Sequence, residues 1–492
     1  MNPRLSRRDV LRHAGIGSIL LANPALLAAC ANEALEPPAP LSIDPQRSWW
    51  MQNNFAPVPE ERELLGLEVT GEIPADLSGT YIRNGPNPKH GDRGHWFVGD
   101  GMLHGVRLHA GRAEWYRNRW VQTSVLERDA AQALRPASSL TETPSNVSLV
   151  QHAGRLLSLG EVGLPFEVTP ELATRGVYDF AGKLKTFMTA HPKIDPMTGE
   201  LHMFGYGIGI PHLTYHLVSA SGELLRSVPI TLPRPAMIHD FQITRSWIVF
   251  YDLPVLVDAK AALNGAPLPF RWQPENGARI GLMPRAGGDA DVIWLPIDPC
   301  YFFHAWNAYE DAMGQVILDV CRMASLWVDT STDFDVAPTP HRYTLDPVRR
   351  SVELEQLDDQ PVDFPRIDER RIGLPHRYGY GLVFDRSADA SRPDKALLTF
   401  GGHRLVKYDR ESQRATSCDL GEARSAGEAL FVPRGASTQE DDGYLMSLVF
   451  DRRSQLSSLE IFAARQLERG AIASVQLPVR IPHGIHGVWV AG

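Results

Sequence analysis

Short runs of β-branched and aromatic residues recur along the chain from about residue 60, and turn-forming residues separate them. Clear examples are residues 246–251, 315–320, 380–385, 397–400 and 444–450. Gly, Pro, Asp or Asn bound these runs, which is typical of β-strands. Helical periodicity is scarce, and residues 125–134 are the best candidate for a short helix. Strand and helix patterns do not alternate, so we predict an all-β fold.

The predicted strands are too numerous for one sandwich. Closing them into a ring protects the edge strands, and a propeller is the architecture that grows in this way. Seven blades of four strands would take about 60 to 65 residues each, which fits the length of the body. The chain has no clear internal repeat, so its own periodicity does not give the number of blades. No shift in composition divides the body, and we predict one domain over residues 45–492.

Composition excludes several classes of function. The net charge is −9 over 492 residues, without a basic block, which argues against nucleic acid as a partner. The body has no apolar run of about twenty residues, so we expect no transmembrane helix in the mature chain. Beyond Cys30, the cysteines are Cys300, Cys321 and Cys418, an odd number without a Cys-x-x-Cys pair. A disulfide framework and a thiolate zinc site are therefore not expected.

The N-terminus has the features of an export signal. Arg7 and Arg8 form a twin-arginine pair, and an apolar stretch over residues 14–29 ends in Leu-Ala-Ala-Cys at 27–30. We predict a Tat signal over residues 1–30, a flexible tether over 31–44, and a periplasmic protein or one anchored on the periplasmic side. Lipid attachment at Cys30 and a free Cys30 both stay open, and the alternative is a chance basic, apolar segment.

One histidine lies in unusually apolar surroundings. His304 stands in the run Phe-Phe-His-Ala-Trp (302–306), and a strand there would place Phe302, His304 and Trp306 on one face. A buried imidazole needs a partner, which is either a hydrogen-bonding group of the core or a metal ion. His191, His239 and His486 also have distinctive neighbours, and long stretches of chain separate the four. Such spacing suits ligands from different blades, although four scattered histidines alone are a weak signal.

The stretches around these histidines resemble the carotenoid cleavage oxygenase family. Four motifs contain the histidines: AHPKIDP (190–196), IHDF (238–241), FHAWNAYE (303–310) and GIHG (484–487). Two more, RNGPNP (83–88) and FVGDGM (97–102), resemble the N-terminal signatures of the family. FPRI (364–367) and EDDGY (440–444) resemble the C-terminal half of the family. The resemblance implies a seven-bladed β-propeller with a cap of loops and short helices over the iron-bearing face.

The resemblance also implies the cofactor and its ligands. One Fe(II) per chain would lie on the propeller axis, held by His191, His239, His304 and His486, with O2 as co-substrate. His483 lacks the Gly-x-Trp that follows His486, so we do not expect it to be a ligand. Imidazole nitrogen also suits zinc, copper and nickel, so the residue types alone do not select iron.

The family places three acidic residues behind the histidines, and the matching positions are Glu161, Asp363 and Glu428. Family members usually have Glu where this chain has Asp363, whose side chain is one methylene shorter. We therefore expect a longer or water-mediated hydrogen bond from its histidine, His304. Ile485 stands where the family usually has Phe, and we expect only a change in packing there.

Members of the family cleave carotenoids, apocarotenoids or phenolic stilbenes. We expect Phe302, Phe303, Trp306 and Trp120 to line an apolar tunnel, with ordinary core packing as the alternative for the three aromatic residues near His304. Trp120 stands about where stilbene-cleaving members have a tyrosine, which favours a polyene substrate.

We therefore predict a non-haem Fe(II) dioxygenase that cleaves a C=C bond of a carotenoid or apocarotenoid taken from a membrane. The alternatives are cleavage of a lignostilbene-type phenol and a non-catalytic propeller that binds an apolar ligand.

Overall fold

A computed structural model describes residues 44, 46–129, 139–328, 334, 336–384 and 401–492. These residues belong to one compact unit that covers 39–492. The predicted signal and nearly all of the predicted tether lie outside the described residues.

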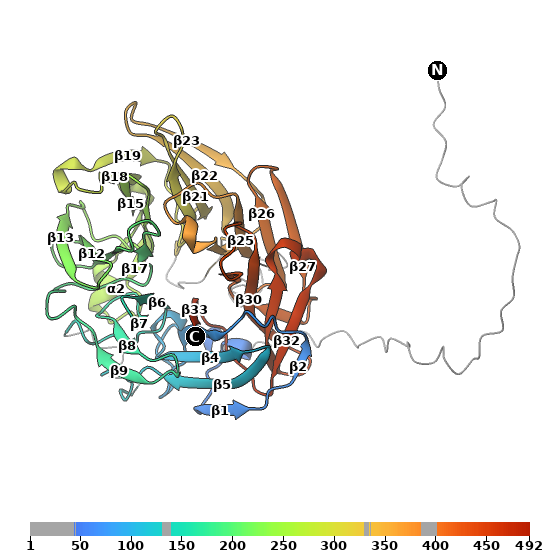
Figure 1. Cartoon of the computed structure of the whole chain (residues 1–492). Coiled ribbons are helices and arrows are strands. Elements are labelled where there is room, and N and C mark those ends of the chain that lie inside the picture. Colours follow the sequence, from blue (N-terminus) through green and yellow to red (C-terminus); the bar gives the residue numbers. More distant parts are fainter. Residues whose placement is uncertain (1–43, 45, 130–138, 329–333, 335, 385–400) are drawn as a thin grey trace, which may run out of the picture. The chain divides into compact units, whose positions relative to one another are not determined.

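Antiparallel strands form seven sheets of at least four strands, which Figure 1 shows arranged as the blades of a propeller. Five of these sheets use strands that lie close together in the sequence. The first contains β6 (Ser148–His152), β7 (Arg155–Leu159), β8 (Phe166–Val168) and β9 (Thr174–Val177). The second contains β10 (Lys193–Ile194), β11 (Leu201–Tyr206), β12 (Leu213–Val218) and β13 (Leu224–Ile230).

The next three sheets follow the same plan. One contains β14 (Gln242–Ile243), β15 (Trp247–Asp252), β18 (Ala278–Pro284) and β19 (Ile293–Ile297). One contains β20 (Ala305–Glu310), β21 (Val316–Arg322), β22 (Thr339–Asp346) and β23 (Ser351–Gln356). The last contains β24 (Val362–Arg366), β25 (Tyr378–Val383), β26 (Arg404–Asp409) and β27 (Arg414–Asp419).

Two sheets combine strands from both ends of the chain and so close the ring. One has the order β1 (Arg62–Leu65), β5 (Arg112–Trp120), β4 (Gly101–His109), β3 (Gly79–Pro86) and β33 (Gly487–Ala491). The other has β2 (Val69–Gly71), β32 (Ala471–Leu477), β31 (Leu456–Ala463), β30 (Gly443–Asp451) and β28 (Arg424–Ala426), with β29 (Leu430–Pro433) also paired to β30. Pairing of β3 with β33 leaves no open end between the first and last blades.

In the part of the chain that the structure describes, helices are few and short. The helix α2 (Ala259–Leu263) lies between the two strands of a small hairpin, β16 (Val255–Val257) and β17 (Phe270–Trp272). The 3-10 helices are Trp49–Met51, Asn53–Phe55, Trp96–Val98, Pro274–Asn276, Asp289–Asp291, Glu369–Arg371 and Ala464–Arg469. Within the described residues, no helix has the length and hydropathy needed to cross a membrane.

Local sequence explains the hairpins that build the blades. Ala153 and Gly154 connect β6 to β7, and their φ angles are 47° and 75°. Two consecutive residues with positive φ form the type I′ turn, whose twist matches that of the paired strands. Glycine adopts this conformation without strain, so its place after Ala153 favours a tight connection.

The all-β, seven-bladed fold is confirmed. Four of the five example strands correspond to β15, β21, β25 and β30, and residues 397–400 lie outside the described part. The predicted helix over 125–134 is not formed where the structure describes it: residues 124–127 form a turn, and 128–129 have no regular structure.

Candidate metal centre

The four singled-out histidines lie at equivalent places in four different sheets. His191, His239, His304 and His486 each stand one to three residues before an edge strand, namely β10, β14, β20 and β33. The prediction that His304 lies within a strand is therefore wrong, because β20 begins at Ala305. The chain before β20 is irregular, so the alternation of faces that we assumed for Phe302, His304 and Trp306 does not apply there.

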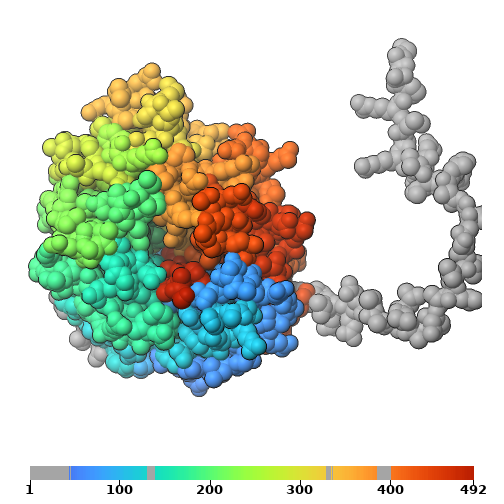
Figure 2. Space-filling model, in the orientation of Figure 1, coloured from blue at the N-terminus to red at the C-terminus, as the bar shows by residue number. Residues whose placement is uncertain are grey.

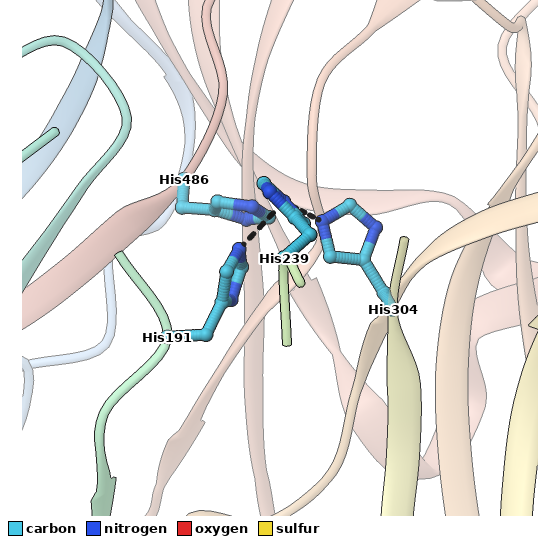
Figure 3. Close-up of side chains that lie close together, drawn as sticks. All are labelled: His191, His239, His304 and His486. Atoms are coloured by element: carbon cyan, nitrogen blue, oxygen red, sulfur yellow. Dashed lines mark hydrogen bonds between the residues drawn. The ribbon is translucent and has the colours of Figure 1, made fainter. Parts of the chain in front are cut away.

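The imidazole rings of these histidines converge on one point (Figure 3). Nε2 of His239 lies 2.9 Å from Nε2 of His191 and 3.3 Å from Nε2 of His304. One ligand nitrogen from each of the four rings lies within 4.8 Å of the others. Two nitrogens bound to one metal ion at about 2.1 Å and at a right angle would be about 3.0 Å apart. The arrangement therefore has the dimensions of a four-histidine metal site.

Three carboxylates accept hydrogen bonds from the outer nitrogens of these rings. Nδ1 of His239 donates to Glu161 at 2.8 Å, and Nδ1 of His486 donates to Glu428 at 2.7 Å. Nδ1 of His304 donates directly to Asp363 at 2.7 Å. The expected longer or water-mediated bond to this shorter acid is thus not found.

Each of the seven sheets contributes one residue to this arrangement. The four histidines come from the sheets that contain β10, β14, β20 and β33. Glu161 follows β7, Asp363 lies in β24, and Glu428 lies between β28 and β29. These are the three sheets that supply no histidine to the four-histidine cluster. The ring of blades therefore assembles residues that the sequence separates widely.

Hydrogen bonding prepares the rings to bind a metal ion. An Nδ1–H that donates to a carboxylate leaves the lone pair of Nε2 directed into the centre. Nε2 of His486 is buried and has no hydrogen-bonding partner among the residues that the structure describes, which is the situation expected for a ligand atom. The residues present therefore fit a metal ion bound by nitrogen ligands.

Burial and neighbouring charges set the pKa values of the rings. Burial lowers the pKa of His486 to about 4, against the opposing charge of Glu428. Burial and the other three rings lower the pKa of His191 well below its usual value. Burial also lowers the pKa of His239, but Glu161 and other nearby carboxylates outweigh it and raise the pKa. Only a neutral imidazole can bind a metal ion, so the low pKa of His191 and His486 favours the binding form.

Two further residues support the carboxylates, and sequence reasoning assigned no role to either. The Tyr206 hydroxyl donates to Glu161 at 2.7 Å, and Arg366 donates to Glu428 at 2.8 Å. Burial raises the pKa of Glu428, but the charges of Arg366 and His486 outweigh it and lower the pKa. Tyr206 ends a fully buried strand and gave no signal in the sequence, whereas Arg366 lies within a motif already noted.

Two cavities with different linings reach the histidines. A cavity of about 480 Å³ is mostly apolar and reaches His239 and His304. Connecting segments form much of its wall, among them the 3-10 helix Trp96–Val98 and residues 265–269 before β17. A second cavity, of about 500 Å³, is more polar and reaches His191, His304 and His486. In the space-filling view, a hollow lies near the centre of the visible face, beside residues from the C-terminal end (Figure 2).

The aromatic residues predicted for the tunnel wall separate into different environments. Phe303 lines the apolar cavity, and its ring lies 5.2 Å from that of His239. Phe302 lines neither cavity, because it packs in the core against Tyr251 at 4.7 Å. Trp306 borders the polar cavity and donates its indole N–H to the backbone of Tyr380.

Trp120 also lies apart from both cavities. Its indole N–H donates to the carbonyl of Asn87 at 2.9 Å, and its ring packs with Met102 and Leu126. A cluster of phenylalanines that sequence reasoning did not assign lines the apolar cavity instead: Phe97, Phe334, Phe364 and Phe384. The substrate argument based on Trp120 therefore loses its basis.

The structure places His483 and Ile485, which precede His486 in the sequence, in different surroundings. His483 stays outside the cluster, and its ring packs against Phe55 at 4.7 Å. Ile485 lines the apolar cavity, so the change from the usual Phe affects the cavity wall and not only core packing.

Comparisons with known proteins agree with this geometry. The profile of the retinal pigment epithelial membrane protein family (RPE65) matches residues 55–491. A carotenoid cleavage oxygenase of Mycobacterium tuberculosis is 35% identical over 89% of this chain and 97% of its own length. A carotenoid 9,10(9',10')-cleavage dioxygenase of Arabidopsis thaliana is 32% identical over 90% of this chain and 89% of its own length.

A solved structure extends the likeness to the fold. The crystal structure of Pseudomonas brassicacearum lignostilbene dioxygenase matches with a TM-score of 0.82 and 30% identity, over 91% of this chain and 99% of that one. Sequence, fold and the four-histidine site thus agree. The chain belongs to the RPE65/carotenoid cleavage oxygenase family and is a dioxygenase of this non-haem iron group, which cleaves C=C bonds.

Proposed function

We propose that this enzyme cleaves a C=C bond of an apocarotenoid or carotenoid. Fe(II) would be held by His191, His239, His304 and His486, and O2 would be the co-substrate. The alkene R–CH=CH–R′ and one O2 give two carbonyl products, R–CHO and R′–CHO, so both oxygen atoms end in the products. Fe(II), when bound, can share electrons with O2, and this allows triplet O2 to react with a closed-shell alkene.

The lining of the apolar cavity is the main observation that supports a polyene substrate. Its wall is mostly hydrocarbon and reaches the histidines, as a conjugated polyene would require. Charged groups on the wall are already paired: Arg93 with Asp100 at 2.9 Å, and Arg128 with Glu142 at 2.7 Å. No lysine lines this cavity within the described residues. A phenol would therefore find few unused polar partners there, which favours the polyene.

The residues of the chain orient the ligands and exclude water. Glu161, Asp363 and Glu428 fix the rings of three histidines through their Nδ1–H groups. These carboxylates would also offset the positive charge of a divalent ion held only by neutral nitrogens. Phe303 and Phe364 lie beside the rings of His239 and His304, where they keep the reaction space apolar.

Two alternatives remain testable. Cleavage of a lignostilbene-type phenol is supported by the high structural similarity to a lignostilbene dioxygenase. A non-catalytic propeller that binds an apolar ligand has less support, because all four histidines and their three acid partners are in place.

Oxygen uptake by the full chain loaded with Fe(II) tests these proposals. Apocarotenals and hydroxystilbenes would be supplied in parallel, and mass spectrometry would identify the products. We expect uptake with apocarotenals and two carbonyl products, and we expect none in the His304→Ala variant. Uptake only with stilbenes would overturn the polyene proposal and support the stilbene alternative. Bound iron without any uptake would favour the non-catalytic alternative.

We also propose that the substrate is taken from a membrane. Ile208 is 62% exposed and borders the apolar cavity, and Ile210 in the same loop is 91% exposed. Leu263 is 88% exposed and adjoins Ala262, which also lines the cavity. Exposed apolar side chains at the rim of an apolar cavity support docking on a lipid surface.

Sedimentation with lipid vesicles tests this docking. We expect the double variant Ile210→Asp, Leu263→Asp to bind vesicles at least about tenfold more weakly, with unchanged activity on substrate dissolved in detergent. Val348 is 90% exposed but lies in the β22–β23 turn, away from the cavity lining, so Val348→Asp is the matched control. Equal binding by both variants would contradict the proposal.

A further inference from the structure

His191 differs from the other three histidines in how its ring is supported. His239, His304 and His486 each donate Nδ1–H to a carboxylate. Within the described part of the chain, no carboxylate accepts a hydrogen bond from His191. Its ring lies against the rings of the other three histidines, so the backbone that carries His191 has more influence on where the ring lies.

The backbone that follows His191 has little regular structure of its own. The strand β10 after His191 has two residues, and β14 after His239 also has two. The strands after His304 and His486 have six and five residues. Two-residue strands contribute few ladder hydrogen bonds, so a side-chain contact has more influence on where these two histidines lie.

One buried ion pair joins these weakly anchored segments. Nζ of Lys193, two residues after His191, lies 2.6 Å from Oδ1 of Asp240. Asp240 directly follows His239 in the sequence. Oδ2 of Asp240 also accepts the backbone N–H of Ala305, the residue after His304, at 3.2 Å. The carboxylate of Asp240, which itself adjoins His239, therefore contacts one residue two positions after His191 and one residue directly after His304.

Burial and further hydrogen bonds fix this carboxylate. The Asp240 side chain is 2% exposed, and that of Lys193 is 13% exposed at the wall of the polar cavity. Oδ1 of Asp240 also accepts the backbone N–H of Phe241 at 2.8 Å. Charged groups that are removed from water and fully paired hold one geometry strongly, because any other arrangement leaves a charge unpaired.

We propose that the Asp240–Lys193 pair positions His191, and through Ala305 also ties His304 to the same point. The pair acts in place of the acid that the ring of His191 lacks. Neither residue touches the reacting atoms, so both are positioning residues. This inference rests on the proposed function, since it takes the four histidines to be the metal ligands.

Titration of the metal-free full chain with Co(II) tests the inference independently of activity. The visible spectrum of bound Co(II) reports ligand geometry as well as occupancy. We expect Lys193→Met and Asp240→Asn to lower the affinity for Co(II) by about 10–100-fold, the usual effect of losing an outer partner of a metal ligand, and to alter the spectrum. Lys193→Arg keeps the charge and should retain most of the affinity.

Lys183→Met is the matched control. Lys183 pairs with Glu223 at 2.8 Å on the surface, where both side chains are about half exposed or more. We expect this variant to bind Co(II) as the wild type does. Circular dichroism would establish that each variant is folded. Because Lys193→Met leaves Asp240 with its backbone donors, it tests the proposal even if Asp240→Asn fails to fold.

The double variant shows whether Lys193 and Asp240 affect metal binding as a pair or independently of each other. If the two residues act as a pair, Lys193→Met combined with Asp240→Asn should cost no more affinity than the more severe single variant. Wild-type-like affinity and spectra in both single variants would overturn this inference and leave the ligand set intact. Full Co(II) binding by His304→Ala would instead overturn the ligand set, and this inference with it.

Discussion

Asp363 accepts a hydrogen bond from Nδ1 of His304 at 2.7 Å, the same length as the bond from His486 to the longer Glu428. A bulge in β24 explains how the shorter acid reaches. The register with β25 shifts between Asp363 and Arg366, and Phe364 adopts a φ of 52°. A bulge re-aims the side chains next to it, and here it allows Asp363 to contact the ring directly.

Substitution of Asp363 should therefore show that its charge matters and that its length does not limit the enzyme. We expect Asp363→Asn to lower metal affinity by about 10–100-fold, because a neutral amide supports the His304 ring less well. Asp363→Glu should give no gain in metal affinity or rate, since the direct bond already exists and the site is buried. Metal titration and oxygen uptake measure both effects. A faster, tighter-binding Glu variant would contradict this account.

His486 and His483 provide a matched pair for the ligand assignment. Both are buried and stand three residues apart, but only His486 belongs to the four-histidine cluster. We expect His486→Ala to abolish metal binding and activity in a folded protein. His483→Ala should keep full metal occupancy, measured by elemental analysis. Loss of metal in the His483 variant and retention in the His486 variant would reverse the assignment.

Alanine substitutions of the neighbouring Phe302 and Phe303 should have different effects on stability and catalysis. Phe303→Ala enlarges the cavity beside His239, so we expect kcat/KM for a polyene to fall at least about tenfold. Phe302 is 1% exposed in the core, so Phe302→Ala should cost about 3–5 kcal/mol of unfolding free energy. Its kcat/KM per folded molecule should stay near that of the wild type. Steady-state kinetics and chemical denaturation measure the two effects, and the reverse pattern would contradict the placement of these rings.

Stability should fall in mild acid because of buried neutral histidines. Burial lowers the pKa of His216 from 6.5 to about 4. Both ring nitrogens contact hydroxyl groups, of Thr186 and Ser227, at 2.7 Å. Between these two pH values the unfolded chain binds the proton and the folded chain does not. Acidification through this window therefore favours unfolding, by about 3 kcal/mol for this group.

Denaturation curves of His216→Gln at pH 7 and pH 4.5 test this dependence. The glutamine cannot take up the proton, so the variant should lose less stability than the wild type over the same interval. An identical loss in both proteins would show that His216 does not contribute.

Export remains a proposal from the sequence, and it can be tested in cells. We expect Arg7→Lys with Arg8→Lys to hold the protein in the cytoplasm, because the Tat pathway reads the arginine pair. If Cys30 carries a lipid, Cys30→Ser should move the exported protein from the membrane fraction to the soluble periplasmic fraction. Fractionation with an antibody against the chain measures both outcomes. Export that survives the double lysine change would contradict the Tat assignment.

The sequence by itself determined where many strands form and which short motifs contain the candidate metal ligands. Runs such as 246–251 follow the apolar and β-branched preferences of strands, and the structure forms β15 there. The four histidine motifs could be recognised because each keeps its own short context of neighbours. His483 could likewise be set aside from its local context alone.

Only the tertiary structure decided which side chains meet. The start of β20 at Ala305 and the bulge beside Asp363 depend on pairing with neighbouring strands, which no local pattern encodes. Phe302 and Phe303 are identical and adjacent in the sequence, yet one packs in the core and the other lines the apolar cavity. The Asp240–Lys193 pair likewise joins segments of two blades. Such contacts arise when the ring of blades closes, because closure brings distant segments to a common axis that the linear sequence does not specify.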